Sequence, residues 1–262
     1  MTSFSAGGNA YDDQGDGDVT FLFLPGWCGP RTYFEALADR LSAGHRTLTI
    51  DWRGHGESEP ASRDFGVEEL VDDAGALIEQ IGASRVVPVA AAHAGWVAIE
   101  LRRRLGAELV PGIVFLDWMV LGAPEPFLGA LGGMANRATT RAVVDGLTDM
   151  WLADIELPAI ATYVASMAKN DDEMWARAAR EIAAQFERNG VPLENVAKLD
   201  PAPPTLHLYA QPGDPAFLRA QQGFAAEHPW FGVEKLDAVS HFPIFEVPDA
   251  IAAHLSRFAA QL

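Results

Sequence analysis

The chain has 262 residues, 49% of them hydrophobic, and a formal net charge of −17 at pH 7. This supplies a core for one large α/β domain or two small ones, and the lack of clustered Lys and Arg excludes nucleic acid or an anionic membrane surface as a partner. Residues 1–18 lack the pattern of a signal peptide, and no apolar run approaches the roughly 18 residues of a membrane span. The single cysteine, Cys28, excludes an internal disulfide, so we expect a cytoplasmic globular protein.

Short β-rich runs alternate with helical spacing in the first half of the chain. Strands are predicted at Val19–Leu24, Arg46–Asp51, Arg85–Val89 and Gly112–Leu116, and helices at Tyr33–Leu41, Val67–Ile81 and Ala94–Leu105. This alternation is typical of a parallel sheet covered by helices on both faces.

The alternation lapses from Gly122 to Val196, where helix-forming stretches rich in Ala, Met and Trp follow one another. It resumes with a strand at Thr205–Ala210, a helix at Pro215–Glu227, a strand at Phe231–Leu236 and a closing amphipathic helix that carries Ile251, Leu255 and Phe258. We therefore predict an α/β core formed by residues 1–121 and 197–262, with a helical cap inserted at 122–196.

Ligand sites of open parallel sheets lie beyond the carboxyl ends of the strands. The segments predicted there are Gly26-Trp27-Cys28, Asp51–Ser58, Ala92-His93, Asp117-Trp118, Asp214 and Ser240–Pro243. The small residues around Ala92 are typical of a nucleophile elbow, the sharp strand-to-helix turn that carries the nucleophile of many hydrolases. A methyl group cannot attack a substrate, so any chemistry here must use a base and a shaped pocket.

His241 is the predicted general base, because an imidazole has a pKa near neutral pH and this one lies on a loop before the last helix. Its orienting carboxylate is either Asp117 or Asp214. Asp214 has another explanation, since an Asp directly before a proline is typical of a helix N-cap. Asp117 closes a buried strand and has no such explanation, so it is favoured.

The backbone amides of Trp27 and His93 are candidates for an oxyanion hole. Trp27, Trp118, Trp151 and Trp175 are candidate walls of an aromatic pocket, although tryptophans also serve as ordinary core residues. Four further histidines are expected at surfaces or strand edges: His45, His207, His228 and His254. No histidine spacing indicates a metal site, and Gly54-x-Gly56 lacks the third glycine of a dinucleotide fingerprint.

The order of the Asp-x-Arg-Gly-x-Gly-x-Ser loop, the elbow and the late histidine resembles the α/β-hydrolase fold. More narrowly, the chain resembles the cofactor-free 3-hydroxy-4(1H)-quinolone 2,4-dioxygenases from about Phe21 to its C-terminus. The segments that carry this resemblance are Pro25–Cys28, Asp51–Gly56, His93–Val97, Asp117-Trp118, His228–Phe231 and His241–Pro243. The resemblance implies ring opening with O2 and release of carbon monoxide, with no metal or flavin, and it assigns the base to His241 and its partner to Asp117.

Two positions depart from that family, whose better-known members carry a serine at the position of Ala92 and, in some, a histidine at that of Gly29. Small residues at 129–135 of the cap, together with overall likeness, favour a 2-alkyl substrate such as 2-heptyl-3-hydroxy-4(1H)-quinolone, although the same residues also suit close helix packing. Two other readings stay open: an esterase or amidase that has lost its nucleophile at Ala92, and a non-enzymatic receptor for a small apolar molecule. The sequence leaves the oligomeric state undetermined.

Overall fold

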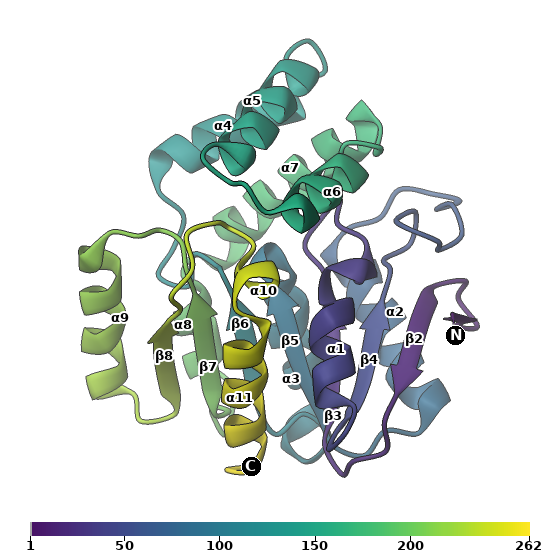
Figure 1. Cartoon of the computed structure of the whole chain (residues 1–262), viewed down its shortest axis with the longest axis vertical. Helices are drawn as coiled ribbons and strands as arrows, with labels where there is room; N and C mark the ends of the chain where they lie inside the picture. The colour runs from purple at the N-terminus through teal and green to yellow at the C-terminus, as the bar shows by residue number, and fades with distance from the viewer. Residues whose placement is uncertain (1) are drawn as a thin grey trace.

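The computed structural model describes residues 2–262 and contains one eight-stranded sheet with the order β1-β2-β4-β3-β5-β6-β7-β8. The strands are β1 (Ser3–Phe4), β2 (Ala10–Gln14), β3 (Thr20–Leu24), β4 (Arg46–Ile50), β5 (Val86–Ala91), β6 (Ile113–Leu116), β7 (Thr205–Tyr209) and β8 (Phe231–Lys235). Strands β3 to β8 are parallel, and β1 and β2 add an antiparallel edge. The carboxyl ends of six strands therefore meet at one edge of the sheet (Figure 1).

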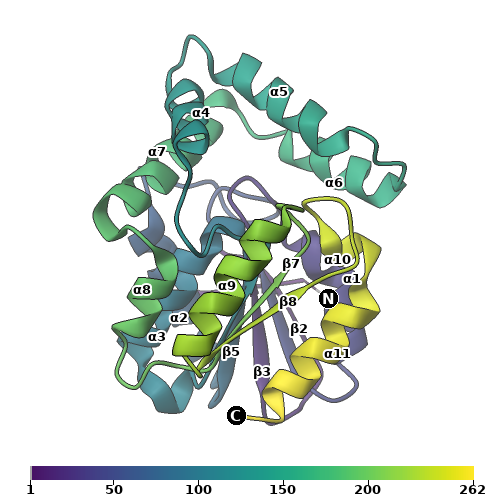
Figure 2. The same cartoon turned by 90° about the vertical axis from the view of Figure 1, so that its left-hand side faces the viewer.

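Helices cover both faces of this sheet, as the alternating pattern predicts. Helices α1 (Glu35–Leu41) and α11 (Pro248–Ala259) pack together on one face, while α2 (Val67–Ile81) and α3 (Gly95–Leu109) pack together on the other (Figures 1 and 2). The remaining core elements are the 3-10 turns Arg31–Phe34 and Ala92–Ala94 and the helices α9 (Pro215–Glu227) and α10 (Pro243–Glu246). Every residue of β3 and β5 is buried, as expected of central parallel strands.

A helical cap stands above the carboxyl ends of the strands (Figures 1 and 2). Its helices are α4 (Glu125–Ala135), α5 (Thr140–Leu152), α6 (Pro158–Met167) and α7 (Asp172–Asn189). The next helix, α8 (Pro192–Ala197), leads back to the core and packs beside α3 (Figure 2). The longest cap helix, α7, begins where the Asp171 side chain accepts a hydrogen bond from the Met174 amide at 2.8 Å. The cap region is confirmed, whereas the limits 122–196 for a separate insertion stay a prediction.

The N-terminal edge was not predicted from the sequence. Only Ala10 and Tyr11 of β2 are buried, and the rest of that strand is polar and partly or fully exposed, so it has little hydrophobic pattern. One histidine also differs from its prediction: His207 lies on β7 with no exposed surface instead of at a surface or strand edge. No helix among residues 2–262 combines the length and the apolar character needed to cross a membrane.

Candidate active site

The turn after β5 keeps the geometry of a nucleophile elbow although its apex is an alanine. Ala92 has φ 47°, in the left-handed region that costs a residue with a Cβ roughly 1–2 kcal/mol. Gly26 lies beside it, in the loop of residues 25–30 that follows β3, here called the early loop. A Cβ added at Gly26 would be 3.8 Å from the Ala92 Cβ. The loop that carries Trp27 and the turn that carries His93 are therefore neighbours.

Asp117 and His241 are 124 positions apart in the sequence and are in contact in the fold. The His241 Nδ1 atom lies 3.1 Å from Asp117 Oδ2. The other carboxylate oxygen, Oδ1, accepts hydrogen bonds from the amides of Ala210 at 2.5 Å and Gln211 at 3.2 Å. Buried at the end of β6 and held by the end of β7, Asp117 can fix the orientation of the imidazole and stabilise its protonated form.

Asp214, the alternative partner, does not contact His241. Its side chain accepts a hydrogen bond from the Ala216 amide at 2.8 Å, and it is the exposed N-cap of α9. The structure therefore places it in the structural role that its position before Pro215 suggested.

Trp151 of cap helix α5 lies over the His241 ring. The two rings are 5.9 Å apart at an interplanar angle of 17°, and the His241 side chain remains 32% exposed. Because Nδ1 faces Asp117, Nε2 is the nitrogen left to accept a proton from a ligand. The geometry presents a base between the core and the cap.

His93 offers its side chain as well as its backbone. Trp118 Nε1 donates a hydrogen bond to His93 Nδ1 at 3.1 Å, so the proton of the neutral ring resides on Nε2. Burial, with a smaller contribution from nearby His241, lowers the pKa of His93 to about 3. The prediction for His93 concerned only its main chain, so this neutral imidazole donor is an addition from the structure.

The other two candidate tryptophans, Trp27 and Trp175, are buried and do not pack against the His241 ring. Trp27 stacks on Phe65, with 5.6 Å between ring centroids, and Trp175 on α7 makes no ring-to-ring contact with another aromatic side chain of residues 2–262. No aromatic contact joins either of them to His241 within that range. Their place as pocket walls stays a prediction.

His55 supports the early loop, a role that the sequence did not reveal. The Cys28 amide donates a hydrogen bond to His55 Nε2 at 3.1 Å, and Asn170 of the cap donates one to the Cys28 carbonyl at 2.9 Å. Cys28 itself has φ 65°, so both bonds hold a strained residue directly after Trp27. Burial lowers the pKa of His55, which favours the neutral ring that can accept this bond.

Cys28 is buried, and burial raises the pKa of its thiol far above the usual value, which does not suit a nucleophile. Within residues 2–262, no group of three or more His, Cys, Asp or Glu side chains is placed to hold a metal ion. The Asp117–His241 pair has the geometry for proton transfer.

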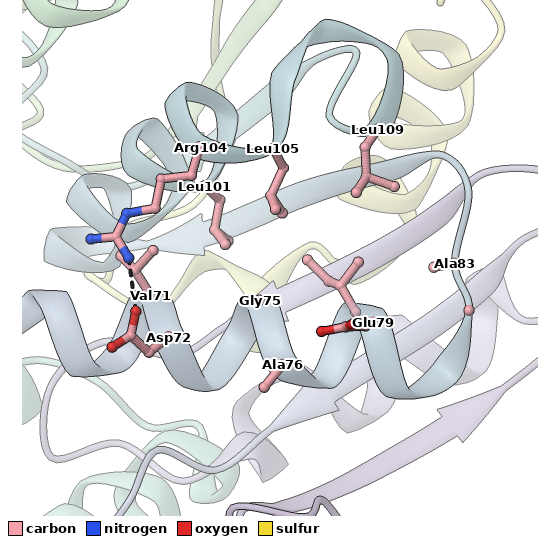
Figure 3. A pocket seen from close by; sticks show the side chains of 12 residues that line it. Val71, Asp72, Gly75, Ala76, Glu79, Ala83, Leu101, Arg104, Leu105 and Leu109 are labelled. Atoms are coloured by element: carbon pink, nitrogen blue, oxygen red, sulfur yellow. Dashed lines mark hydrogen bonds and ion pairs between the residues drawn. The ribbon is translucent and has the colours of Figure 1, made fainter.

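A groove of about 640 Å³ opens elsewhere, between α2 and α3, where Leu101, Leu105 and Leu109 of α3 and Val71 of α2 line it (Figure 3). An ion pair between Arg104 and Asp72, with 2.8 Å between Nη1 and Oδ1, bridges the two helices at this groove. None of its lining residues belongs to the Asp117–His241 cluster, so the groove is separate from the candidate active site.

Comparison with known proteins supplies the family. Residues 21–254 match the model of the alpha/beta hydrolase family. The chain is 33% identical over 246 residues to a 2-heptyl-3-hydroxy-4(1H)-quinolone dioxygenase of Mycobacteroides abscessus, covering 93% of this chain and 91% of that protein. It is 31% identical over 265 residues to 1H-3-hydroxy-4-oxoquinoline 2,4-dioxygenase of Pseudomonas putida, covering 98% and 99%.

The same family emerges from solved structures. A variant of the dioxygenase AqdC in complex with its substrate, the Pseudomonas quinolone signal, matches with a TM-score of 0.93 and 32% identity, over 100% of this chain and 99% of that one. The chain therefore belongs to the cofactor-free 3-hydroxy-4-quinolone 2,4-dioxygenase family, built on the α/β-hydrolase fold.

Proposed function

We propose that this protein opens the ring of a 2-alkyl-3-hydroxy-4(1H)-quinolone with O2 and forms carbon monoxide and an N-acylanthranilate. The reaction needs neither a metal nor a flavin in this proposal. The observation that carries it is the Asp117–His241 pair, held at 3.1 Å beneath the cap next to an elbow with no nucleophile. A route that begins with proton abstraction has no step that Ala92 would disable.

His241 Nε2 takes the proton of the substrate 3-hydroxyl, and Asp117 stabilises the imidazolium that forms. The electron-rich substrate anion passes an electron to O2, and recombination gives a peroxide at C2. This peroxide attacks the C4 carbonyl to form a bridge from C2 to C4. The O–O, C2–C3 and C3–C4 bonds then break, and C3 leaves as carbon monoxide with the former 3-hydroxyl oxygen. Both atoms of O2 remain in the N-acylanthranilate, so the atoms balance without a further reductant.

The surrounding residues bind and orient the substrate in this proposal. The backbone amides of Trp27 and His93 stabilise negative charge that develops on the substrate oxygen, and their loops are neighbours through Gly26 and Ala92. Trp151 supplies an aromatic surface directly over the base, and Trp118 fixes the His93 ring. The neutral His93 ring can donate a hydrogen bond to a substrate oxygen.

The 2-alkyl group is supported by the relatives rather than by the glycines of the cap. A 2-heptyl substrate appears in the name of the Mycobacteroides abscessus relative, and the matched AqdC variant is bound to the Pseudomonas quinolone signal. Gly129 and Gly132 of α4 are exposed, and a Cβ at either would meet nothing within 4 Å, so they do not line an enclosed pocket. Comparing kcat/KM for the 2-heptyl and 2-methyl quinolones tests the preference, and equal values would remove it.

The base is tested by comparing His241→Ala with His254→Ala, which changes a histidine on α11 whose Nδ1 atom contacts Arg257 instead of a residue of the candidate site. Each protein is mixed anaerobically with the quinolone, air is admitted, and carbon monoxide and substrate loss are followed. We expect His241→Ala to lower kcat/KM by about 10²–10⁴-fold and His254→Ala to leave it unchanged. Full activity of His241→Ala, or activity that requires added iron or flavin, would refute the proposal.

The rival esterase is tested by Ala92→Ser. A hydrolase that lost its nucleophile would gain hydrolysis of p-nitrophenyl esters and would leave hydroxyquinolones untouched. If the protein is a dioxygenase, we expect the reverse. Quinolone cleavage continues in Ala92→Ser with a changed KM, and no ester hydrolysis appears. A receptor would bind the quinolone and turn over neither substrate.

A further inference from the structure

A buried histidine and a buried glutamine form a polar pair behind Asp117. His207 lies on β7 and Gln221 on α9, and neither has any exposed surface. The His207 Nδ1 atom is 2.5 Å from Gln221 Oε1, and the Trp118 amide donates a hydrogen bond to His207 Nε2 at 3.2 Å. The pair thus connects a helix on the outside of the sheet to the residue that follows Asp117.

These contacts allow only one protonation state of the ring. The Trp118 amide is a donor, so His207 Nε2 must accept, and the proton of a neutral ring must then sit on Nδ1. The Nδ1 proton faces Gln221 Oε1, an acceptor, which fixes the orientation of the glutamine amide. Burial lowers the pKa of His207 to about 4, in agreement with a neutral ring.

The bond from the Trp118 amide supports a strained turn. Asp117 has φ 48°, and its own amide donates to the Leu208 carbonyl at 3.0 Å. The two successive amides of the turn are therefore both held by β7, one by its backbone and one by the His207 ring. Beyond this turn, the Asp117 carboxylate contacts His241 and the Trp118 indole contacts His93.

We propose that His207 and Gln221 are positioning residues that set the Asp117-Trp118 turn, and through it the orientation of both His241 and His93. Neither touches the space where the substrate is proposed to bind. The kinetic part of this inference rests on the proposed function, whereas its spectroscopic part does not.

The test compares His207→Leu with His207→Gln. Leucine removes the acceptor and leaves the Trp118 amide without a partner, while the glutamine oxygen can reach the position of Nε2 and accept the same bond. We expect His207→Leu to lower kcat by about 10–100-fold with KM changed less than about threefold, because the substrate still binds but the base is misplaced. His207→Gln should retain kcat within about threefold of the native enzyme.

The substrate-free readout is the downfield proton NMR signal of the His241 Nδ1 proton bonded to Asp117, assigned through its absence in His241→Ala. It should shift or disappear in His207→Leu and remain in His207→Gln. If His207→Leu does not fold, Gln221→Met provides the second case, since it removes the acceptor for Nδ1 without a large change in volume. There we expect kcat to fall by about 3–10-fold, with a shifted downfield signal.

The proposal is overturned if the folded His207→Leu or Gln221→Met variant keeps the native signal and the native kcat. It is also overturned if kcat falls as far in His207→Gln as in His207→Leu, because the hydrogen-bond acceptor at this position would then not control activity. Should the native enzyme leave every quinolone intact, the proposed function fails, and the NMR comparison still decides whether this pair positions Asp117.

Discussion

The Tyr163 hydroxyl fills the space in which a side chain at Gly29 would begin. A Cβ added at Gly29 would lie 2.1 Å from Tyr163 Oη and 3.2 Å from its Cζ. Tyr163 belongs to cap helix α6, and its ring packs 4.9 Å from that of Tyr33 and 5.4 Å from that of Phe242. The cap therefore sits on the early loop in a way that has no room for the histidine that some family members carry at position 29.

This contact predicts that Gly29→Ala is harmful alone and tolerated with Tyr163→Phe. The added methyl collides with the hydroxyl, so we expect Gly29→Ala to destabilise the protein by about 1–3 kcal/mol. Removing the oxygen leaves the nearest ring carbon 3.2 Å away, which small shifts can relieve. Denaturant unfolding of the two single variants and the double variant measures this, and additive losses would contradict it.

Asp117 and Asp214 should separate activity from stability. We expect Asp117→Asn to lower kcat/KM by about 10²–10⁴-fold, because an amide neither stabilises the imidazolium nor favours the required tautomer. Asp214→Ala removes only the N-cap of α9, so it should lower the free energy of unfolding by about 1 kcal/mol and leave kcat unchanged. Steady-state kinetics and urea unfolding of both variants are the measurements, and a loss of kcat in Asp214→Ala would reverse the assignment.

Most of the fold could be predicted from the sequence because the central strands β3, β5 and β6 are short apolar runs and helical spacing alternates with the strands. The predicted strand at Gly112–Leu116 and the observed β6 at Ile113–Leu116 differ by one residue, and the helix Pro215–Glu227 was predicted at its observed bounds. The edge strand β2 could not be predicted from the sequence, because its pairing with β4 and not a hydrophobic face defines it. The limits of the cap insertion remain predictions.

The part of the candidate site that consists of polar residues after strand ends could be predicted from the sequence. The part that depends on side-chain packing could not. His241 and Asp117 stood out because polar residues follow the ends of strands, and the structure brings them together. No sequence pattern indicates that His55 and His207 are buried, since an isolated histidine in a loop or strand can be either buried or exposed. Each of these rings accepts a hydrogen bond from the backbone amide of a residue distant in sequence, which only the folded chain reveals.

Gly95 should be essential to the packing of Trp118. A Cβ at Gly95 would lie 2.2 Å from the Trp118 ring, whose own indole proton is bonded to His93. We expect Gly95→Ala to destabilise the protein by about 1–3 kcal/mol. Gly223→Ala is the matched control, because its Cβ would meet nothing within 4 Å in α9, and it should stabilise the protein by about 0.5–1 kcal/mol. Thermal unfolding of both variants decides, and a neutral Gly95→Ala would show that the indole can move.

Acid should weaken the native protein through His207. Its pKa falls from 6.5 in the unfolded chain to about 4 when folded, so between these values the unfolded state binds more protons and stability declines as the pH falls. The groups that face the ring are Asp117, Tyr209, Phe217 and Gln221, and none of them is a cation. Relative to His207→Gln, we expect the native protein to lose about 2 kcal/mol between pH 7.5 and pH 5. Urea unfolding at both pH values measures the difference, and a constant difference would mean that His207 does not titrate this way.

The fate of oxygen tests the central claim most directly. The protein is supplied with 2-heptyl-3-hydroxy-4(1H)-quinolone under ¹⁸O2 in unlabelled water, and both products are analysed by mass spectrometry. We expect two ¹⁸O atoms in the N-acylanthranilate and unlabelled carbon monoxide, because the peroxide bridges C2 and C4 while C3 leaves with its own oxygen. Incorporation of only one ¹⁸O atom, label in the carbon monoxide, or oxygen derived from water at the acyl carbon would contradict that claim.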